Sequence, residues 1–181
     1  TTPEGKITFN NKEVVDMMSF FQDMLEEGLL IRPPATMGSF EEMNGAYIEG
    51  KVATVLESTS WLANMDGVID FDWEFAFLPA GTGGNAVTAG GGNFALTRTA
   101  SDTEKEAAAK YFEYISGPEI SAEFHMNTGY MPTRKSVLDI PEVKAFHKEN
   151  PSYLVSVNQL EFARPSSGYT KNVKSVWYRL T

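Results

Sequence analysis

The sequence predicts an α/β fold, because amphipathic helical segments alternate with short apolar runs that are rich in β-branched residues. The predicted order is two helices, a strand, a helix, two strands and then only helices, without an internal repeat. Strands that are separated by helices favour mostly parallel pairing within one sheet. At 42% hydrophobic residues, the chain of 181 residues has enough apolar side chains for one domain or two small lobes.

Two helices are predicted in the first fifty residues. Apolar residues recur every three or four positions over 11–30, and Asn11 can cap the start of this helix. A shorter helix is expected over 39–50, where Ser39 and Glu42 have the spacing of a capping box.

Three short strands are predicted in the middle of the chain. They are VATVL at 52–56, WEFAFL at 73–78, and a segment that begins at 94–96. Between the first two, residues 61–65 are predicted to form the first turns of another helix. Trp73 lies in a run of aromatic residues with strand-like spacing, so its side chain is expected in the core.

The last eighty residues are predicted to be mainly helical. A helix is expected over 101–116, with Ser101 and Glu104 in capping-box spacing, and a second one restarts at Pro118, because proline suits a first helical turn. Three further helical segments are predicted over 141–149, 153–162 and 169–180.

The charge balance argues against a nucleic-acid partner. The chain has 15 Lys and Arg against 24 Asp and Glu, which gives a formal net charge of −9, and no basic patch is visible. The composition also argues against intrinsic disorder. The sequence shows neither an apolar run of transmembrane length nor a signal peptide at its start, so the expectation is a cytosolic protein or the trimmed part of an exported one.

The content of cysteine and histidine excludes several kinds of site. The chain has no cysteine, which rules out disulfides, thiolate metal sites and cysteine nucleophiles. Its two histidines, His125 and His147, do not have a metal-binding spacing. We therefore expect no metal, no cofactor and no histidine-based catalysis.

The segment 80–93 is the strongest change of composition, since it holds six of the 15 glycines. Exposed amides in such a loop suit an anion, but both the GxxxxGK[ST] pattern and a GxGxxG that opens a helix are lacking. Two interpretations stay open, namely a flexible crossover between lobes and direct contact with a ligand.

Two aromatic residues are candidates for ligand contact. Trp61 follows a predicted strand and a turn, which is where α/β proteins place ligands, although it could equally be a core residue. Tyr130 lies between Gly129 and Met131-Pro132, so it either points its phenol at a ligand or caps the preceding helix.

Enzymatic alternatives rest on the acidic and hydroxyl residues. Glu57 lies beside Ser58 and near Ser60, but the chain has no GxSxG elbow, which disfavours a serine hydrolase. Paired carboxylates for glycoside hydrolysis stay open, with Glu57 as a candidate acid or base. A purely structural interaction domain is favoured if Trp61 and Tyr130 are buried against other protein atoms.

Several ordered stretches resemble the C-terminal part of the family 1 extracellular solute-binding proteins of ABC transporters, which include maltose and glycerol-3-phosphate binders. The stretches are ITFNNKEVVDMMSFFQDMLEEGLL, FEEMNGAYIEGKVATVLESTSWLANM, FDWEFAFLPAG, AGGGNFAL, EAAAKYFEYISGPEISAEFHMNTGYMPTRKS and FARPSSGY. The resemblance implies a periplasmic-binding-protein-like (type II) fold, here an incomplete two-lobe architecture with a helix-rich C-terminal part.

The resemblance also implies a function without catalysis. Such proteins capture a small polar solute between two lobes and deliver it to a membrane permease. The expected ligand is a sugar, an oligosaccharide or a polyol phosphate such as glycerol 3-phosphate. The expected location is periplasmic or extracellular, with a lipid anchor on the full-length protein as one form of attachment.

Site residues carry over from the family one by one. Ser58, Gly91 and Tyr130 occupy the positions of ligand contacts in glycerol-3-phosphate binders, and Trp61 aligns with an aromatic residue that stacks on sugar in maltose-type binders. A late arginine that binds phosphate corresponds approximately to Lys174, which cannot form a two-pronged contact, so Arg164 is the alternative.

The resemblance further implies how the chain is divided. Members of the family have roughly twice as many residues, so 1–80 are expected in part of the second lobe. Residues 81–132 would then form the crossover and part of the first lobe, and 133–181 a helical return to the second. A complete cleft is not expected from this chain alone, which would be a fragment or would complete its sheets with another chain.

Overall fold

The computed structural model describes residues 10–32 and 39–164. The chain forms two compact units, one that contains the described residues up to Val55 and one that consists of Leu56–Arg164. The following paragraphs describe each unit by itself. The assignment of 1–80, 81–132 and 133–181 to lobes stays a prediction.

The first unit contains two helices, as the sequence predicts. Helix α1 (Lys12–Glu26) begins after Asn11, whose side chain accepts a hydrogen bond from the backbone N–H of Val14 at 3.1 Å. Helix α2 spans Ser39–Ile48. None of the α1 side chains is buried, so the described residues leave the apolar face of this helix uncovered.

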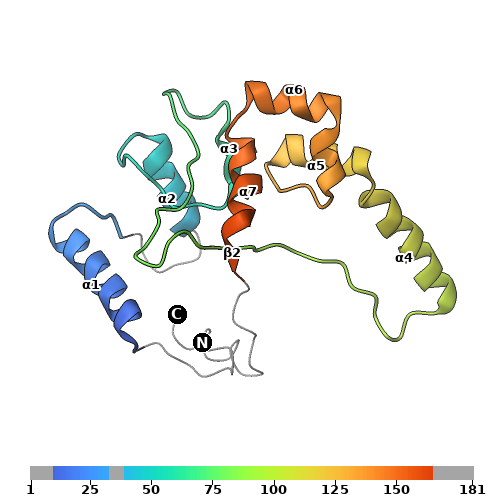
Figure 1. Cartoon of the computed structure of the whole chain (residues 1–181), viewed down its shortest axis with the longest axis horizontal. Helices are drawn as coiled ribbons and strands as arrows, with labels where there is room; N and C mark the ends of the chain where they lie inside the picture. Colours follow the sequence, from blue (N-terminus) through green and yellow to red (C-terminus); the bar gives the residue numbers. More distant parts are fainter. Residues whose placement is uncertain (1–9, 33–38, 165–181) are drawn as a thin grey trace. The chain divides into compact units, whose positions relative to one another are not determined.

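The second unit is largely helical (Figure 1). Its helices are α3 (Leu62–Met65), α4 (Asp102–Ile115), α5 (Pro118–Thr128), α6 (Pro141–Glu149) and α7 (Tyr153–Gln159), with 3₁₀ turns η1 (Thr59–Trp61), η2 (Lys135–Asp139) and η3 (Leu160–Phe162). Each helix predicted within this unit is present. The helix predicted over 169–180 lies outside the described residues.

Local capping signals explain where α4 and α5 begin. The Ser101 side chain accepts a hydrogen bond from the N–H of Glu104, whose carboxylate accepts one in return from the Ser101 N–H at 2.7 Å. These bonds hold the pKa of Glu104 below its ordinary value. Helix α5 begins at Pro118, in the first helical turn, where a missing N–H costs nothing.

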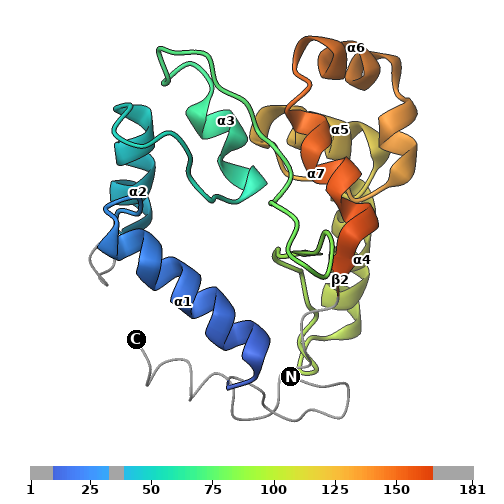
Figure 2. The same cartoon turned by 60° about the vertical axis from the view of Figure 1, so that its left-hand side comes forward.

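The core of the second unit lies between α5, η2 and α6. It is formed by Ala122, Val137 and Val143, against which Met126 and Ile140 pack. Helices α5, α6 and α7 lie side by side in both ribbon views (Figures 1 and 2), and α3 also contacts α5. The C-terminal end of α5 therefore lies at the junction between the core and α3.

The three predicted strands are wrong, since 52–56, 73–78 and 94–96 are not paired as strands in the described structure. Two backbone amides of segment 73–78 instead donate to side chains at the two ends of α7. The N–H of Leu78 donates to Oε1 of Gln159 at 2.7 Å, and the N–H of Phe75 to Oγ of Ser152 at 3.4 Å. An apolar run becomes a strand only when a neighbouring backbone pairs with it, and here side chains satisfy these amides instead.

Trp73 is half-buried rather than fully buried, and its ring packs edge-on against Phe75, with centroids 5.7 Å apart. The described part of the chain has one sheet, in which β1 (Val87–Thr88) pairs in parallel with β2 (Ala163–Arg164). Parallel pairing agrees with the prediction, although it joins other segments than the predicted ones.

The glycine-rich segment is exposed along most of its length. Gly84 and Gly91 have positive φ angles of 90° and 142°. A Cβ atom added at any glycine of this segment would meet no protein atom within 4 Å. Two of its glycines therefore adopt backbone conformations that other residues rarely adopt. None of the glycines in this segment packs closely against the rest of the described chain.

No helix in the described ranges has the length and apolar character needed to cross a membrane.

Candidate functional site

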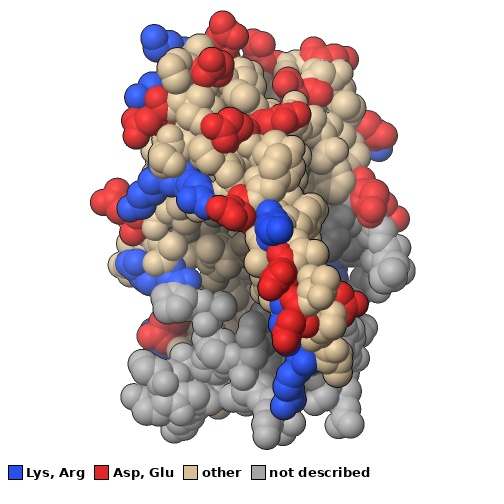
Figure 3. All heavy atoms as spheres, turned by 90° about the vertical axis from the view of Figure 1, so that its right-hand side faces the viewer, with Lys and Arg blue, Asp and Glu red and all other residues tan. Residues whose placement is uncertain are grey.

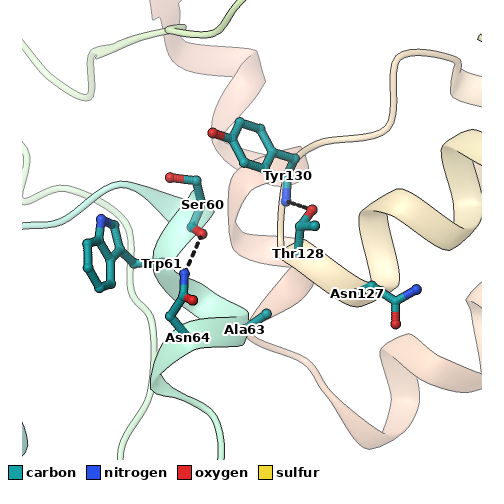
Figure 4. A pocket seen from close by; sticks show the side chains of 7 residues that line it. All are labelled: Ser60, Trp61, Ala63, Asn64, Asn127, Thr128 and Tyr130. Atoms are coloured by element: carbon teal, nitrogen blue, oxygen red, sulfur yellow. Dashed lines mark hydrogen bonds between the residues drawn. The ribbon is translucent and has the colours of Figure 1, made fainter. Parts of the chain in front are cut away.

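A pocket of about 300 Å³ lies in the second unit, between the segment that contains η1 and α3 and the end of α5 (Figure 4). Seven residues line it: Ser60, Trp61, Ala63, Asn64, Asn127, Thr128 and Tyr130. Its volume is at the lower end of the range for small-molecule sites. The pocket combines the two aromatic residues that the sequence singled out.

A network of short polar contacts shapes the turn before Trp61. Oγ of Ser58 accepts a hydrogen bond from the N–H of Ser60 and lies 2.9 Å from the Ser60 hydroxyl oxygen. The carboxylate of Glu57 accepts a hydrogen bond from the N–H of Ser58 at 2.6 Å. The turn is thus fixed by its own side chains, which is the ordinary use of serine at a helix start.

Helix α3 anchors this segment in the interior. Leu62 and Met65 are 2% and 1% exposed, whereas Trp61 is only half-buried. The buried pair holds the short helix, and in Figure 4 the indole of Trp61 projects to the side opposite Asn127 and Thr128. Trp61 is therefore not fully buried, and its contact with a ligand stays a prediction.

Gly129 lets the end of α5, which forms one wall of the pocket, lie against η1 and α3, which form the other wall. It caps the end of α5 with a φ of 80°, a left-handed conformation that glycine adopts without strain. A Cβ atom at Gly129 would lie 2.6 Å from Cβ of Leu62 and 2.7 Å from the carbonyl oxygen of Thr59. Only glycine allows the end of α5 to approach η1 and α3 this closely.

Tyr130 is held by its backbone, while its ring is free to contact a ligand. The Thr128 hydroxyl donates to the carbonyl oxygen of Phe124 at 2.6 Å and accepts a hydrogen bond from the N–H of Tyr130 at 3.2 Å. The Tyr130 carbonyl oxygen accepts a hydrogen bond from Nδ1 of His125 at 2.6 Å. Tyr130 is 45% exposed as a residue, and its ring packs beside Phe124.

The chemistry of the lining is polar and uncharged. The hydroxyl groups come from Ser60, Thr128 and Tyr130, the amides from Asn64 and Asn127, and the apolar groups from Trp61, Ala63 and the Tyr130 ring. In Figure 4 the Asn127 side chain points away from Trp61, and its amide donates to the carbonyl oxygen of Glu123 at 2.9 Å. An aromatic face with several hydroxyl and amide groups suits a polyhydroxyl compound.

Charged side chains are dispersed elsewhere on the molecule. On the face in Figure 3, lysine and arginine side chains are interspersed with aspartate and glutamate and do not gather into one basic patch. Arg134 donates from Nε to the carbonyl oxygen of Ser116 and so ties the loop after Tyr130 to the end of α4.

The predicted site residues have different places in the structure. Trp61 and Tyr130 line the pocket, and Ser58 adjoins it through its contact with Ser60. The other two described candidates do not line it: Gly91 lies in the exposed glycine-rich segment, and Arg164 lies on β2. Lys174 is outside the described residues.

Sequence reasoning missed Ser60, Asn64, Asn127 and Thr128 as lining residues. Ser60 and Asn64 are four positions apart and flank Trp61, so a helical reading of this segment could have placed them on one side of it. Asn127 and Thr128 directly precede Gly129 at the end of α5. The pattern that could have indicated these two lining residues is a polar helix end directly before a glycine and an aromatic residue.

Most of the chain is similar in sequence to known proteins. A family model described as "Bacterial extracellular solute-binding protein" matches residues 2–151. The sn-glycerol-3-phosphate-binding periplasmic proteins UgpB of Escherichia coli O1:K1 and of strain K12 are both 23% identical over 176 residues. Each alignment covers 94% of this chain and 39% of the relative, so the chain spans well under half of these proteins.

A solved structure is similar in fold as well as in sequence. It is the crystal structure of UgpB from Mycobacterium tuberculosis in complex with glycerophosphocholine, which matches with a TM-score of 0.61 and 30% sequence identity. The match covers 67% of this chain and 31% of that one. It confirms the predicted periplasmic-binding-protein-like (type II) fold, present here as a helix-rich part with a small sheet. The chain belongs to the bacterial extracellular solute-binding protein family.

Proposed function

We propose that this chain is part of the substrate-binding component of an ABC importer, which captures a small polyhydroxyl solute and delivers it to a membrane permease. The observation that carries the proposal is the pocket that forms where Gly129 packs against Thr59 and Leu62, with Trp61 and Tyr130 among its lining residues. A solute-binding protein has no reaction to catalyse, and the proposed location is periplasmic or extracellular, as the family description indicates.

The roles of the lining residues follow from their chemistry. Trp61 offers a flat apolar surface to the carbon face of a sugar or glycerol unit. The Tyr130 phenol and the Ser60 hydroxyl can each donate or accept a hydrogen bond, and Asn64 can do both through its amide. Ser58 supports Ser60 at 2.9 Å, so we propose that it acts at the edge of the site.

The uncharged lining bears on the class of ligand. The names of the relatives point to glycerol 3-phosphate and glycerophosphocholine as solutes of those proteins. A phosphate group is bound most strongly by charged donors, and the seven lining residues carry no charged side chain. We therefore propose that Gly91 and either Arg164 or Lys174 complete a phosphate site in the whole protein, and that the pocket described here holds the glycerol or sugar part.

The experiment that tests this function measures ligand binding to the protein with and without the indole of Trp61. Isothermal titration calorimetry with glycerol 3-phosphate, glycerophosphocholine and maltose would give the affinities. Trp61→Ala is expected to weaken binding by more than about tenfold, because it removes the largest apolar side chain among the lining residues. Its melting temperature should change little, since Trp61 is only half-buried.

Trp73→Phe is the matched control, because Trp73 is also half-buried but does not line the pocket. It should leave the affinity unchanged. Equal affinities of the native protein and Trp61→Ala would contradict the proposed site. Release of a cleaved sugar from maltose during the titration would instead favour the carbohydrate-active enzyme with carboxylate groups such as Glu57.

A further inference from the structure

Helix α1 has a broad apolar face that the described residues leave uncovered. Val14, Met18, Phe21 and Leu25 follow one another at steps of four, three and four residues, which places them on one side of the helix. Large apolar side chains on and after this helix are 37–67% exposed: Val15, Met17, Met18, Phe20, Phe21, Leu25, Leu29 and Ile31. An apolar surface of this extent indicates a contact site.

The helix is held at both ends by its own residues. At the start, Asn11 accepts the hydrogen bond from the N–H of Val14. At the other end, Gly28 has a φ of 70°, and the N–H of Leu29 donates to the carbonyl oxygen of Met24 at 2.8 Å. The apolar face is therefore already formed before a partner covers it.

The remaining surface of α1 is polar and acidic. Lys12 forms an ion pair with Asp16, and the amide of Gln22 donates to the carboxylate of Glu26 at 2.9 Å. The helix has one lysine against four acidic residues, which gives a net charge of −3. A partner for the apolar face is thus expected to combine an apolar surface with positive charge.

The end of the chain has a segment with this combination. Its apolar residues recur at the same steps of four, three and four positions: Tyr169, Val173, Val176 and Leu180. Residues 169–180 contain three basic residues and no acidic one, a net charge of +3 in a chain whose net charge is −9. The segment lies outside the described residues, and its sequence pattern is that of a helix with one apolar face.

We propose that segment 169–180 packs as a helix on the apolar face of α1. The two apolar faces have the same spacing and length, so each can cover the other along its whole course. The charges of −3 and +3 attract each other across the contact, whereas a second copy joined through α1 would bring two charges of −3 together. The proposal concerns the packing of the chain itself and does not rest on the function proposed above.

The first test introduces pairs of cysteines, which report the contact without background because the chain has none. In the register that aligns the two apolar faces, Phe21 lies opposite Val176 if the helices run parallel and opposite Val173 if they run antiparallel. The variants are therefore Phe21→Cys/Val176→Cys and Phe21→Cys/Val173→Cys. One of them should form an intramolecular disulfide under mild oxidation, since this bond needs Cα atoms about 4.4–6.8 Å apart.

Asp16→Cys/Val176→Cys is the matched control, because Asp16 lies on the polar side of α1 beside Lys12. Mass spectrometry of the digested protein would quantify each link, and the control should form far less of it. Equal linkage in all variants, or no intramolecular link in either variant of Phe21, would overturn the proposal. Disulfide-linked dimers in place of the intramolecular link would show that a second copy covers α1, which also overturns it.

The second test leaves α1 unchanged and follows the oxidation of Met18 by hydrogen peroxide. Met18 is 59% exposed among the described residues, so a docked segment should protect its sulfur. Val176→Asn should raise the oxidation rate severalfold, because it places a polar amide in the apolar contact. Ser175→Asn introduces the same side chain on the polar side of the segment and should leave the rate unchanged. If both variants are folded by circular dichroism and oxidise at the native rate, the proposal is wrong.

Discussion

Gly129 and the glycine-rich segment over 80–93 show two different uses of the same residue. At Gly129 both the positive φ and the space require glycine, since an added Cβ would meet Leu62 and Thr59 closer than 3 Å. In the glycine-rich segment the added Cβ would meet nothing within 4 Å at any glycine. The number of glycines therefore does not indicate where the backbone packs closely, and a single one at the end of a helix sets the geometry of the pocket.

The largest expected effect comes from Gly129→Ala. A left-handed residue other than glycine costs about 1–2 kcal/mol, and overpacking adds about 1–3 kcal/mol, so the free energy of unfolding should fall by about 2–5 kcal/mol. Urea unfolding would measure this change. A loss below about 1 kcal/mol would show that the end of α5 does not need its close approach to α3.

A smaller effect is expected for Thr128→Val, which keeps the shape of the side chain and removes its two hydrogen bonds. The free energy of unfolding should fall by about 1–2 kcal/mol. Thr99→Val is a matched control, because the hydroxyl of Thr99 makes only an exposed contact with Thr97. If the two variants lose equal stability, the Thr128 bonds do not support the Tyr130 turn.

Tyr130→Phe should affect binding and leave stability unchanged. Tyr130 is 45% exposed, and the loss of the phenol oxygen leaves the packing of its ring against Phe124 intact. Affinity for glycerophosphocholine should weaken by about 1 kcal/mol, the scale of one hydrogen bond. Calorimetry on both proteins would measure the difference, and an unchanged affinity would remove the phenol from the proposed site.

The smallest effect, and one of opposite sign, is expected for Gly90→Ala. This glycine does not have a positive φ, and a methyl group there meets no protein atom within 4 Å. The substitution should stabilise the protein by about 0.4–1 kcal/mol, because it reduces the conformational freedom of the unfolded chain. Destabilisation by more than that amount would reveal a constraint on this segment that the described residues do not show.

Sequence reasoning succeeded where structure depends on neighbouring residues. The helix that starts after Ser101 has the predicted capping box, and α1 begins after Asn11 as expected. It failed for segment 73–78, because the pairing partner of a strand is distant in sequence, and the Leu78 amide donates to the Gln159 side chain instead.

For the site, Trp61 and Tyr130 carried a recognisable signal. The contact of Gly129 with Leu62 and the pairing of His125 with His147 depend on tertiary packing, so the sequence did not reveal them.

The short parallel ladder between β1 and β2 has a consequence for the order of folding. It pairs Val87 with Ala163 and Thr88 with Arg164, so the intervening chain must close before either pair can form. The helices α5, α6 and α7 lie within that intervening chain and make contacts between near neighbours, which form faster. We expect the ladder to form last and to open first, and its amides to exchange with solvent deuterium sooner than those in the middle of α5.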